Sequence, residues 1–308
     1  MTKKAEPLSK FLLPIAKKGV FKAACRLAGA MAEMLGERVS EITLLHVMAG
    51  RYLSTHMANI DIRAEILIES ETFRKIREEF INKEIVPVLN EAKSTIEQFH
   101  PKAPINMEIV DGKPASKILE FVNEHGYSTI FMQRRCIDPV KGSFIGSVTS
   151  GILYGSGACS VYVPGTDFPE SGPVPLNSFL VAVDGSPGSM AAVKEAGVLM
   201  GYAKESKITL LSVVDVVDLA EAAKSDSWPT PVQEAEVTLR AARETLEDMN
   251  IESARISEKI LAGDPAEKIA ALSDESEADI IFLGRTVRSA ITDVLVGSVA
   301  RAVLGRCA

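Results

Sequence analysis

The stretch "FLVAVDGSPGS", residues 179–189, decides the fold class. It begins as a short apolar run typical of a buried β-strand, and at Asp184 it passes into an acid, a glycine and a serine, which are turn residues. An earlier stretch, "FLLPIAKKGVF" at residues 11–21, has the same apolar start but carries Ala16 at the position of Asp184. The chain therefore contains the same element twice, once with the acid and once without it.

Two longer segments repeat at a constant offset. "VDGKPASKILEFVNEHGYSTIFMQRR" from Val110 matches "LAGDPAEKIAALSDESEADIIFLGRT" from Leu261, an offset of 261 − 110 = 151 residues. Nearer the start of each copy, "ITLLHV" at 42–47 matches "ITLLSV" at 208–213, an offset of 208 − 42 = 166 residues. The repeat indicates a duplicated domain. The difference of 166 − 151 = 15 residues predicts one additional helical stretch in the first copy.

Short apolar runs alternate with longer amphipathic ones within each copy. In the second copy the runs are "FLVAV", "ITLLSV", "SEKILA" and "DIIFLG". Near-continuous apolar strands separated by helices predict a parallel sheet covered on both faces, and right-handed crossovers make each copy a doubly wound α/β domain. Thr230, Pro231 and Gln233 form a capping-box signal at one helix start, and Pro87 is expected to mark a break in another helix.

The aperiodic stretch "PGTDFPESGPVPLN" is expected to be a linker over residues 164–177. The predicted domains are then 1–163 and 178–308. "SVYV" at 160–163 is expected to be a fifth strand of the first domain, and the second domain is predicted to lack this last strand. The strand at 279–284 would then have an open edge. We expect that edge to be covered within the chain, as an intramolecular pseudo-dimer, or by a second chain in a homodimer.

Composition restricts the function classes. The chain has 308 residues, 46% of them hydrophobic and 24% charged, and a net charge of −7, which argues against a nonspecific nucleic-acid binder. Apolar runs are too short to cross a bilayer, so a cytoplasmic protein is expected. The four cysteines and four histidines are scattered, which predicts reduced structural thiols and no metal site. His46 ends a strand and is most simply a histidine at the edge of the core.

Ligands of open α/β sheets bind at the carboxyl ends of the strands. Asp184 follows one such end and Gly284 follows another, and Gly297-Ser298 then begins a helix whose free N–H groups suit a phosphate. Taken singly, Asp184 is more often a turn residue and a Gly-Ser pair is more often a helix cap. Together they favour a nucleotide.

At these residues the chain resembles the universal stress protein family in its tandem form. The resemblance rests on "VAVDGS", on "GDPAEKI" and on a Gly-x-x-Gly-x9-Gly-Ser pattern that begins at Gly284. It implies an adenine nucleotide alpha hydrolase-like fold that binds ATP or AMP, with Mg²⁺ as an optional companion. It also implies that Asp184 contacts the adenosine, that the backbone of Val213 edges the adenine, and that ribose and phosphates are held by Gly284, Arg285, Gly297, Ser298 and Val299.

Both copies depart from the family pattern. Val287 occupies the second glycine position in the second copy. In the first copy Ala16 replaces the acid, and Gln133 and Cys136 replace two glycines, which leaves Gly146 and Ser147. The sequence therefore predicts a stress-response regulatory protein with one nucleotide site, in the second domain, and a degenerate site in the first. The alternatives are a nucleotide-free interaction module with both pockets closed and, more weakly, a slow ATPase. Catalysis is not expected.

The degenerate site of the first copy has two further interpretations. Cys136 is either a redox-sensing thiol or a small residue that fills a vacated pocket. A group of basic residues either attracts a different anion or forms a solvated rim; these residues are Lys17, Lys18, Arg134, Arg135 and Lys141.

Overall fold

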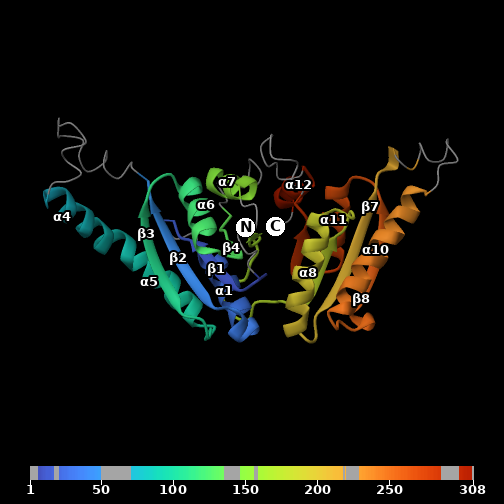
Figure 1. Cartoon of the computed structure of the whole chain (residues 1–308), viewed down its shortest axis with the longest axis horizontal. Helices are drawn as coiled ribbons and strands as arrows, with labels where there is room; N and C mark the ends of the chain where they lie inside the picture. The colour runs from blue at the N-terminus through green and yellow to red at the C-terminus, as the bar shows by residue number, and fades with distance from the viewer. Residues whose placement is uncertain are drawn as a thin grey trace. The chain divides into compact units, whose positions relative to one another are not determined.

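The computed structural model describes residues 6–16, 21–49, 71–134, 146–155, 159–217, 219, 229–285 and 298–306. The chain divides between Gly172 and Pro173 into two compact units, each with its own sheet (Figure 1). Val287, Gly297, Cys136, Cys307 and four of the five basic residues of the first copy (all except Arg134) lie outside the described residues.

The first unit contains a five-stranded parallel sheet in the order β3-β2-β1-β4-β5. Its strands are β1 (Lys10–Pro14), β2 (Glu41–Met48), β3 (Ile105–Asp111), β4 (Thr129–Phe131) and β5 (Ser160–Tyr162). Its helices are α1 (Lys22–Leu35), the short η1 (Gly36–Arg38), α4 (Glu71–Phe80), η2 (Ile81–Ile85), α5 (Val86–Glu97), α6 (Pro114–His125) and α7 (Ser147–Gly155).

The second unit contains a four-stranded parallel sheet in the order β8-β7-β6-β9. Its strands are β6 (Ser178–Ala182), β7 (Lys207–Val214), β8 (Ile256–Ala262) and β9 (Ile280–Leu283). Its helices are α8 (Pro187–Tyr202), α10 (Pro231–Asp248), the short η3 (Ser253–Arg255), α11 (Pro265–Glu275) and α12 (Ser298–Arg306). The predicted fold class, with a second sheet that lacks the fifth strand among the described residues, is confirmed.

Strand register proves to be the same in the two sheets. Phe11 of β1 pairs with Ile42 and Thr129, while Phe179 of β6 pairs with Ile208 and Ile280. The partners differ by 208 − 42 = 166 and 280 − 129 = 151 residues, which are the two offsets of the sequence repeat. The copies therefore share one backbone frame, and Ala16 and Asp184 occupy equivalent places in it.

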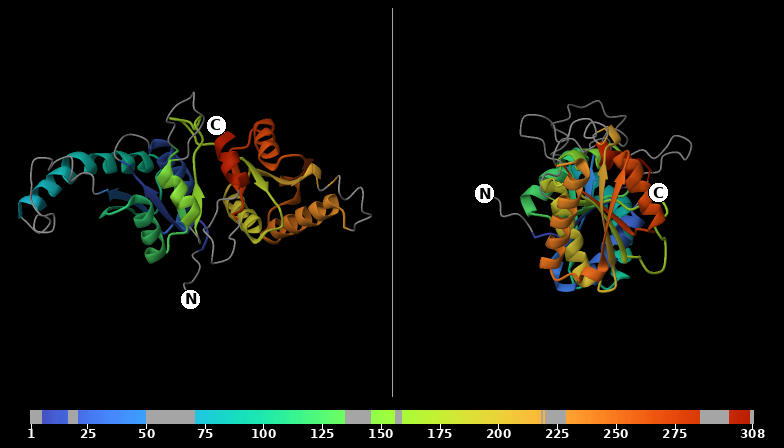
Figure 2. Two further views of the ribbon diagram at one scale, coloured as in Figure 1. Left: turned by 90° about the horizontal axis from the view of Figure 1, so that it is seen from above. Right: turned by 90° about the vertical axis from the view of Figure 1, so that its right-hand side faces the viewer.

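Helices cover both faces of each sheet. In the first unit α1 packs against α5 and α6 packs against α7, and in the second unit α8 packs against α10 and α11 against α12. Figures 1 and 2 show these helices on either side of the strands. One apolar core on the α6 and α7 side of the first sheet includes Leu12, Leu45, Ile118 and Ile152, and the second unit has its equivalent around Leu180, Leu211, Ile269 and Val303.

The repeated Gly-x-Pro-Ala-x-Lys motif has a structural cause. Gly112 and Gly263 both have a positive φ, 147° and 142°, which side chains disfavour. A Cβ on either glycine would also lie 2.6 Å from the side chain of Lys117 or Lys268, respectively. Part of the motif that carries the family resemblance therefore shapes the turn before a helix.

The additional helical stretch of the first copy is α4. Helix α10 begins at Pro231, which corresponds to residue 231 − 151 = 80, so every residue of α4 except its last, Phe80, precedes the point where the second copy begins its helix. The expected break at Pro87 is wrong: the chain runs from α4 through one π-helical turn, η2, directly into α5 (Figure 1). A proline ring clashes with the carbonyl four residues earlier, and a widened turn is one way to accommodate it. The capping box of Thr230 and Gln233 is confirmed.

Candidate functional site

The carboxyl ends of three neighbouring strands meet at one edge of the second sheet. Strand β6 lies between β7 and β9, and all three run parallel. Asp184 follows β6, Val213 lies near the end of β7, and Gly284 directly follows β9. Three of the predicted site residues are therefore brought to the same edge, at the place where the strand order reverses.

Asp184 is an exposed residue held in a tight turn. Its Oδ1 accepts a hydrogen bond from the backbone N of Ser186 at 3.0 Å, and Gly185 takes a φ of 75°. Burial alone would raise the pKa of Asp184, but hydrogen bonds from Ser186 and Ser189 outweigh it, so the pKa lies below its usual value. The carboxylate is thus ionised at neutral pH and can accept hydrogen bonds from hydroxyl groups. The same contacts also show that Asp184 shapes the turn before α8.

Gly284 touches the start of α8 backbone to backbone. A Cβ at Gly284 would lie 2.6 Å from the Cα of Ser189, and a Cβ at Gly188 would lie 2.8 Å from the backbone N of Arg285. The two glycines let the end of β9 and the start of α8 approach closely, so packing alone accounts for Gly284. Gly188 was missed from the sequence, although a glycine in the first turn of a helix is an unfavourable choice that signals a close approach.

The remaining predicted site residues have mixed placements. Val213 is partly buried, and its side chain packs on the core beneath the sheet, as does that of Val299. Ser298 is exposed at the first position of α12. Residues 286–297, which join β9 to α12, lie outside the described residues.

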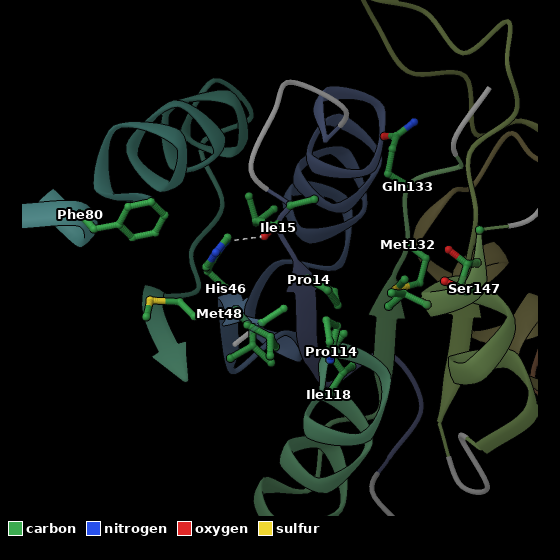
Figure 3. A pocket seen from close by; sticks show the side chains of 17 residues that line it. Pro14, Ile15, His46, Met48, Phe80, Pro114, Ile118, Met132, Gln133 and Ser147 are labelled. Carbon is green, nitrogen blue, oxygen red and sulfur yellow. Dashed lines mark hydrogen bonds between the residues drawn. The ribbon is translucent and has the colours of Figure 1, made fainter. Parts of the chain in front are cut away.

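The first unit holds a cavity of about 360 Å³ at the corresponding edge of its sheet (Figure 3). Among the residues that the structure describes, its wall is mostly apolar and contains no Asp, Glu, Lys or Arg. The apolar residues are Pro14, Ile15, Ala16, Leu45, Val47, Met48, Ala49, Phe80, Pro114, Ile118, Met132 and Val148. The polar or small ones are His46, Gln133, Gly146, Ser147 and Thr149. At this place the first unit therefore has Ala16 instead of an acid, with a cavity beside it.

Two polar side chains of this wall are already engaged within the protein. Nδ1 of His46 lies 2.8 Å from the carbonyl oxygen of Ile15, the contact that is dashed in Figure 3. The Oε1 of Gln133 accepts a hydrogen bond from the backbone N of Ala24 at 3.1 Å, at the start of α1. His46 is a buried histidine at the edge of the core, as the sequence indicated.

The described part of the chain meets the requirements of neither a metal site nor a membrane-spanning helix. There, no three His, Cys, Asp or Glu residues lie close enough to hold a metal ion. No helix among the described residues is both long and apolar enough to span a bilayer. Cys25 and Cys159 are buried free thiols, and burial raises the pKa of Cys25.

Known proteins resemble both halves of the chain. A comparison with protein families matches residues 10–163 and 176–308 to the universal stress protein family. A universal stress protein of Methanocaldococcus jannaschii is 28% identical over 131 residues, which are 41% of this chain and 74% of that protein. The crystal structure of a universal stress protein from Archaeoglobus fulgidus covers 96% of this chain and 94% of its own, with 22% identity and a TM-score of 0.65.

The likeness to the Archaeoglobus fulgidus structure concerns the fold, and it spans both units. The family match covers both copies of the repeat, which share one strand register. The chain is a tandem member of the universal stress protein family.

Proposed function

We propose that the chain is a regulatory universal stress protein of the cytoplasm that binds adenine nucleotide, ATP or AMP, at the carboxyl edge of the second sheet. One observation carries the proposal: β6 lies between β7 and β9, so Asp184, Val213 and Gly284 meet beside the start of α8. An ionised, exposed carboxylate at a switch point is suited to accept hydrogen bonds from ribose hydroxyls.

The family resemblance assigns the other roles. The backbone of Val213 would edge the adenine, and the ribose and phosphates would be held by Gly284, Arg285, Gly297, Ser298 and Val299. The start of α12 at Ser298 would offer N–H groups to phosphate, and Mg²⁺ could accompany ATP. The chain would act by binding rather than by turnover.

Calorimetric titration with ATP and with AMP tests this function. We expect one site per chain, and we expect Asp184→Ala to weaken binding by roughly 1–3 kcal/mol, the usual loss when a polar contact is left unmade. Asp184→Asn is the variant matched to Asp184→Ala, because its amide oxygen can still accept the hydrogen bond from Ser186. Comparison of the two variants therefore separates the loss of the charge from the loss of the turn. Unchanged affinity in both variants would remove Asp184 from the site. Heat denaturation of gently purified protein should release an adenine nucleotide.

A second candidate function, a nucleotide-free interaction module, is favoured by the contact between Gly284 and α8. That contact gives Gly284 a packing role that needs no ligand. The absence of any saturable nucleotide binding, with the fold intact, would select this alternative.

We also propose that the free side of β9 is covered by a strand of another element, in a homodimer or an intramolecular pseudo-dimer. Among the described residues β9 pairs only with β6, and an open apolar edge invites association. Light scattering distinguishes the two arrangements by mass, and amide exchange of residues 280–283 reports whether the edge is protected. Rapid amide exchange of residues 280–283 in a monomeric protein would contradict both the homodimer and the pseudo-dimer.

A further inference from the structure

We propose that the cavity of the first unit binds a small amphiphilic carboxylic acid, with its apolar body among the buried strand ends and its carboxylate at the start of α7. This inference concerns a different unit from the proposed nucleotide site and does not depend on it.

The size and lining of the cavity suit an apolar body. Its volume of about 360 Å³ falls in the range of small-molecule pockets, which are mostly apolar with a few polar groups. Ala16 stands where the second unit has Asp184, and none of the described residues that line the cavity is Asp, Glu, Lys or Arg. A ribose or another polar body would lose its contacts with water here and find few replacements, which is costly.

A residue of the additional helix closes one end of the cavity. Phe80 is the last residue of α4, at the position where the second unit begins α10 with Pro231. In Figure 3 Phe80 lies on the side of Met48, far from Ser147. Methionine side chains such as Met48 and Met132 adapt their shape to an apolar guest. This end of the cavity is therefore suited to contact the hydrocarbon part of a ligand.

The opposite end presents unmatched hydrogen-bonding groups. Thr149 lines the cavity, is only 6% exposed, and makes no side-chain hydrogen bond with any residue that the structure describes. Its hydroxyl is not among the fully buried unpartnered side-chain atoms, so it is open to the cavity, where a bound ligand can accept its hydrogen bond. Thr149 lies in the first turn of α7, where N–H groups lack helical partners and negative charge is stabilised. That turn contains no acidic side chain. A carboxylate satisfies both the hydroxyl and the helix start.

Titration of the full chain with decanoate below its micelle concentration tests the proposal, with decanol as the neutral analogue. We expect saturable binding of one decanoate per chain, with decanol weaker. Thr149→Val removes the hydroxyl at nearly constant shape, so it should lower decanoate affinity several-fold and leave decanol affinity unchanged. Phe80→Ala should weaken both ligands, because it removes apolar contact at the other end.

Ala16→Asp restores the acid of the second unit within the apolar wall. We expect it to weaken decanoate binding by about tenfold or more, through like-charge repulsion and the cost of burying the new carboxylate. Ala191→Asp is the matched control, since it makes the same change at an exposed position of α8 in the second unit and should have no effect. Circular dichroism establishes whether each variant folds. If Ala16→Asp does not fold, the binding measurements on Phe80→Ala decide the outcome.

Three results would overturn the proposal: no saturable decanoate binding, equal affinity for decanol together with no effect of Thr149→Val, or displacement of bound decanoate by ATP. The last result would show that the cavity is a nucleotide site. Loss of nucleotide binding in the Asp184 variants bears on the second unit alone.

Discussion

The two units share three strand pairings in the same register, and they differ at the strand ends where ligands of this fold bind. Phe11 and Phe179 hold identical register positions, yet the residue five places later is Ala16 in one unit and Asp184 in the other. The first unit adds α4 and β5, while the described second sheet has four strands. Because strand register depends on buried side chains and ligand choice depends on a few residues at the strand ends, one copy could change its site while the frame stayed intact.

The contact between the fourth strand and the first helix shows the same divergence in detail. In the second unit Gly284 makes this contact through backbone. The equivalent residue of the first unit is 284 − 151 = 133, and Gln133 makes the contact through its side chain, by accepting from the N of Ala24. The fourth strand therefore contacts the first helix through backbone in one unit and through a side chain in the other. A single substitution can remove each contact separately.

Gly284→Ala should have the largest effect on stability. Its new Cβ would overlap the backbone of Gly188 and Ser189, and overpacking of this kind costs roughly 1–3 kcal/mol. Amide exchange measured peptide by peptide should show the loss of protection in the second unit only, because the units have separate cores. Equal loss in both units would mean that they do not unfold independently. Gly201→Ala is the control, since a Cβ there meets no atom within 4 Å.

Gln133→Ala should destabilise the first unit by about 1 kcal/mol, because it removes the acceptor for an N–H at the start of α1. N-cap residue Phe21 offers no side-chain bond there, so no other cap replaces it. Exchange rates of the first turn of α1 give the direct measurement. Unchanged rates would indicate that water satisfies that N–H equally well.

Tyr127→Phe should cost a similar amount, about 1 kcal/mol, and again only in the first unit. The hydroxyl of Tyr127 bonds Thr43 at 2.7 Å and Glu41 at 3.1 Å, while the second unit has Ala278 at the equivalent position. Tyr202→Phe, at a 43% exposed tyrosine, serves as the control. A first unit that melts at the same temperature in the Tyr127 variant would contradict this account.

Acid should produce the smallest difference between the units. Burial alone would raise the pKa of Glu41, but hydrogen bonds from Thr43, Lys10 and Tyr127 outweigh it and lower that pKa. The stabilisation from Glu41 is therefore complete above its unfolded pKa of about 4.3 and is lost as the pH falls through the lower folded value.

Glu41→Gln should reduce the acid sensitivity of the first unit in this window, whereas Glu37→Gln, at a side chain that is 88% exposed, should not. Thermal unfolding followed from pH 6 downward gives the comparison. Identical pH profiles for wild type and Glu41→Gln would show that ionised Glu41, including its ion pair with Lys10 at 3.1 Å, does not stabilise the first unit.

Sequence patterns predicted the frame because it depends on apolar runs and their spacing. The two offsets, the parallel sheets and the capping box of Thr230 and Gln233 all follow from local pattern. Two features required the folded chain. Gly284 could be assigned to phosphate from its motif, but its neighbour Gly188 lies almost a hundred residues away in sequence and meets it only in three dimensions.

The cavity of the first unit was the second such feature. Ala16 revealed that the acid was gone, but it could not show whether neighbouring side chains had filled the space. Phe80 lines the cavity from the end of α4, and a π turn over Ile81–Ile85 joins α4 to the helix that contains Pro87, where sequence rules predicted a break. A proline pattern alone does not distinguish a broken helix from a widened one.

Nucleotide stoichiometry shows directly whether the two units, which share one backbone frame, carry two different sites. The measurement is calorimetric titration of ATP and of AMP into wild type, Asp184→Asn and Ala16→Asp. We expect one nucleotide per chain in wild type, weaker binding in Asp184→Asn, and unchanged binding in Ala16→Asp. Two nucleotides per chain, or a loss of nucleotide binding on substitution of Ala16, would contradict it.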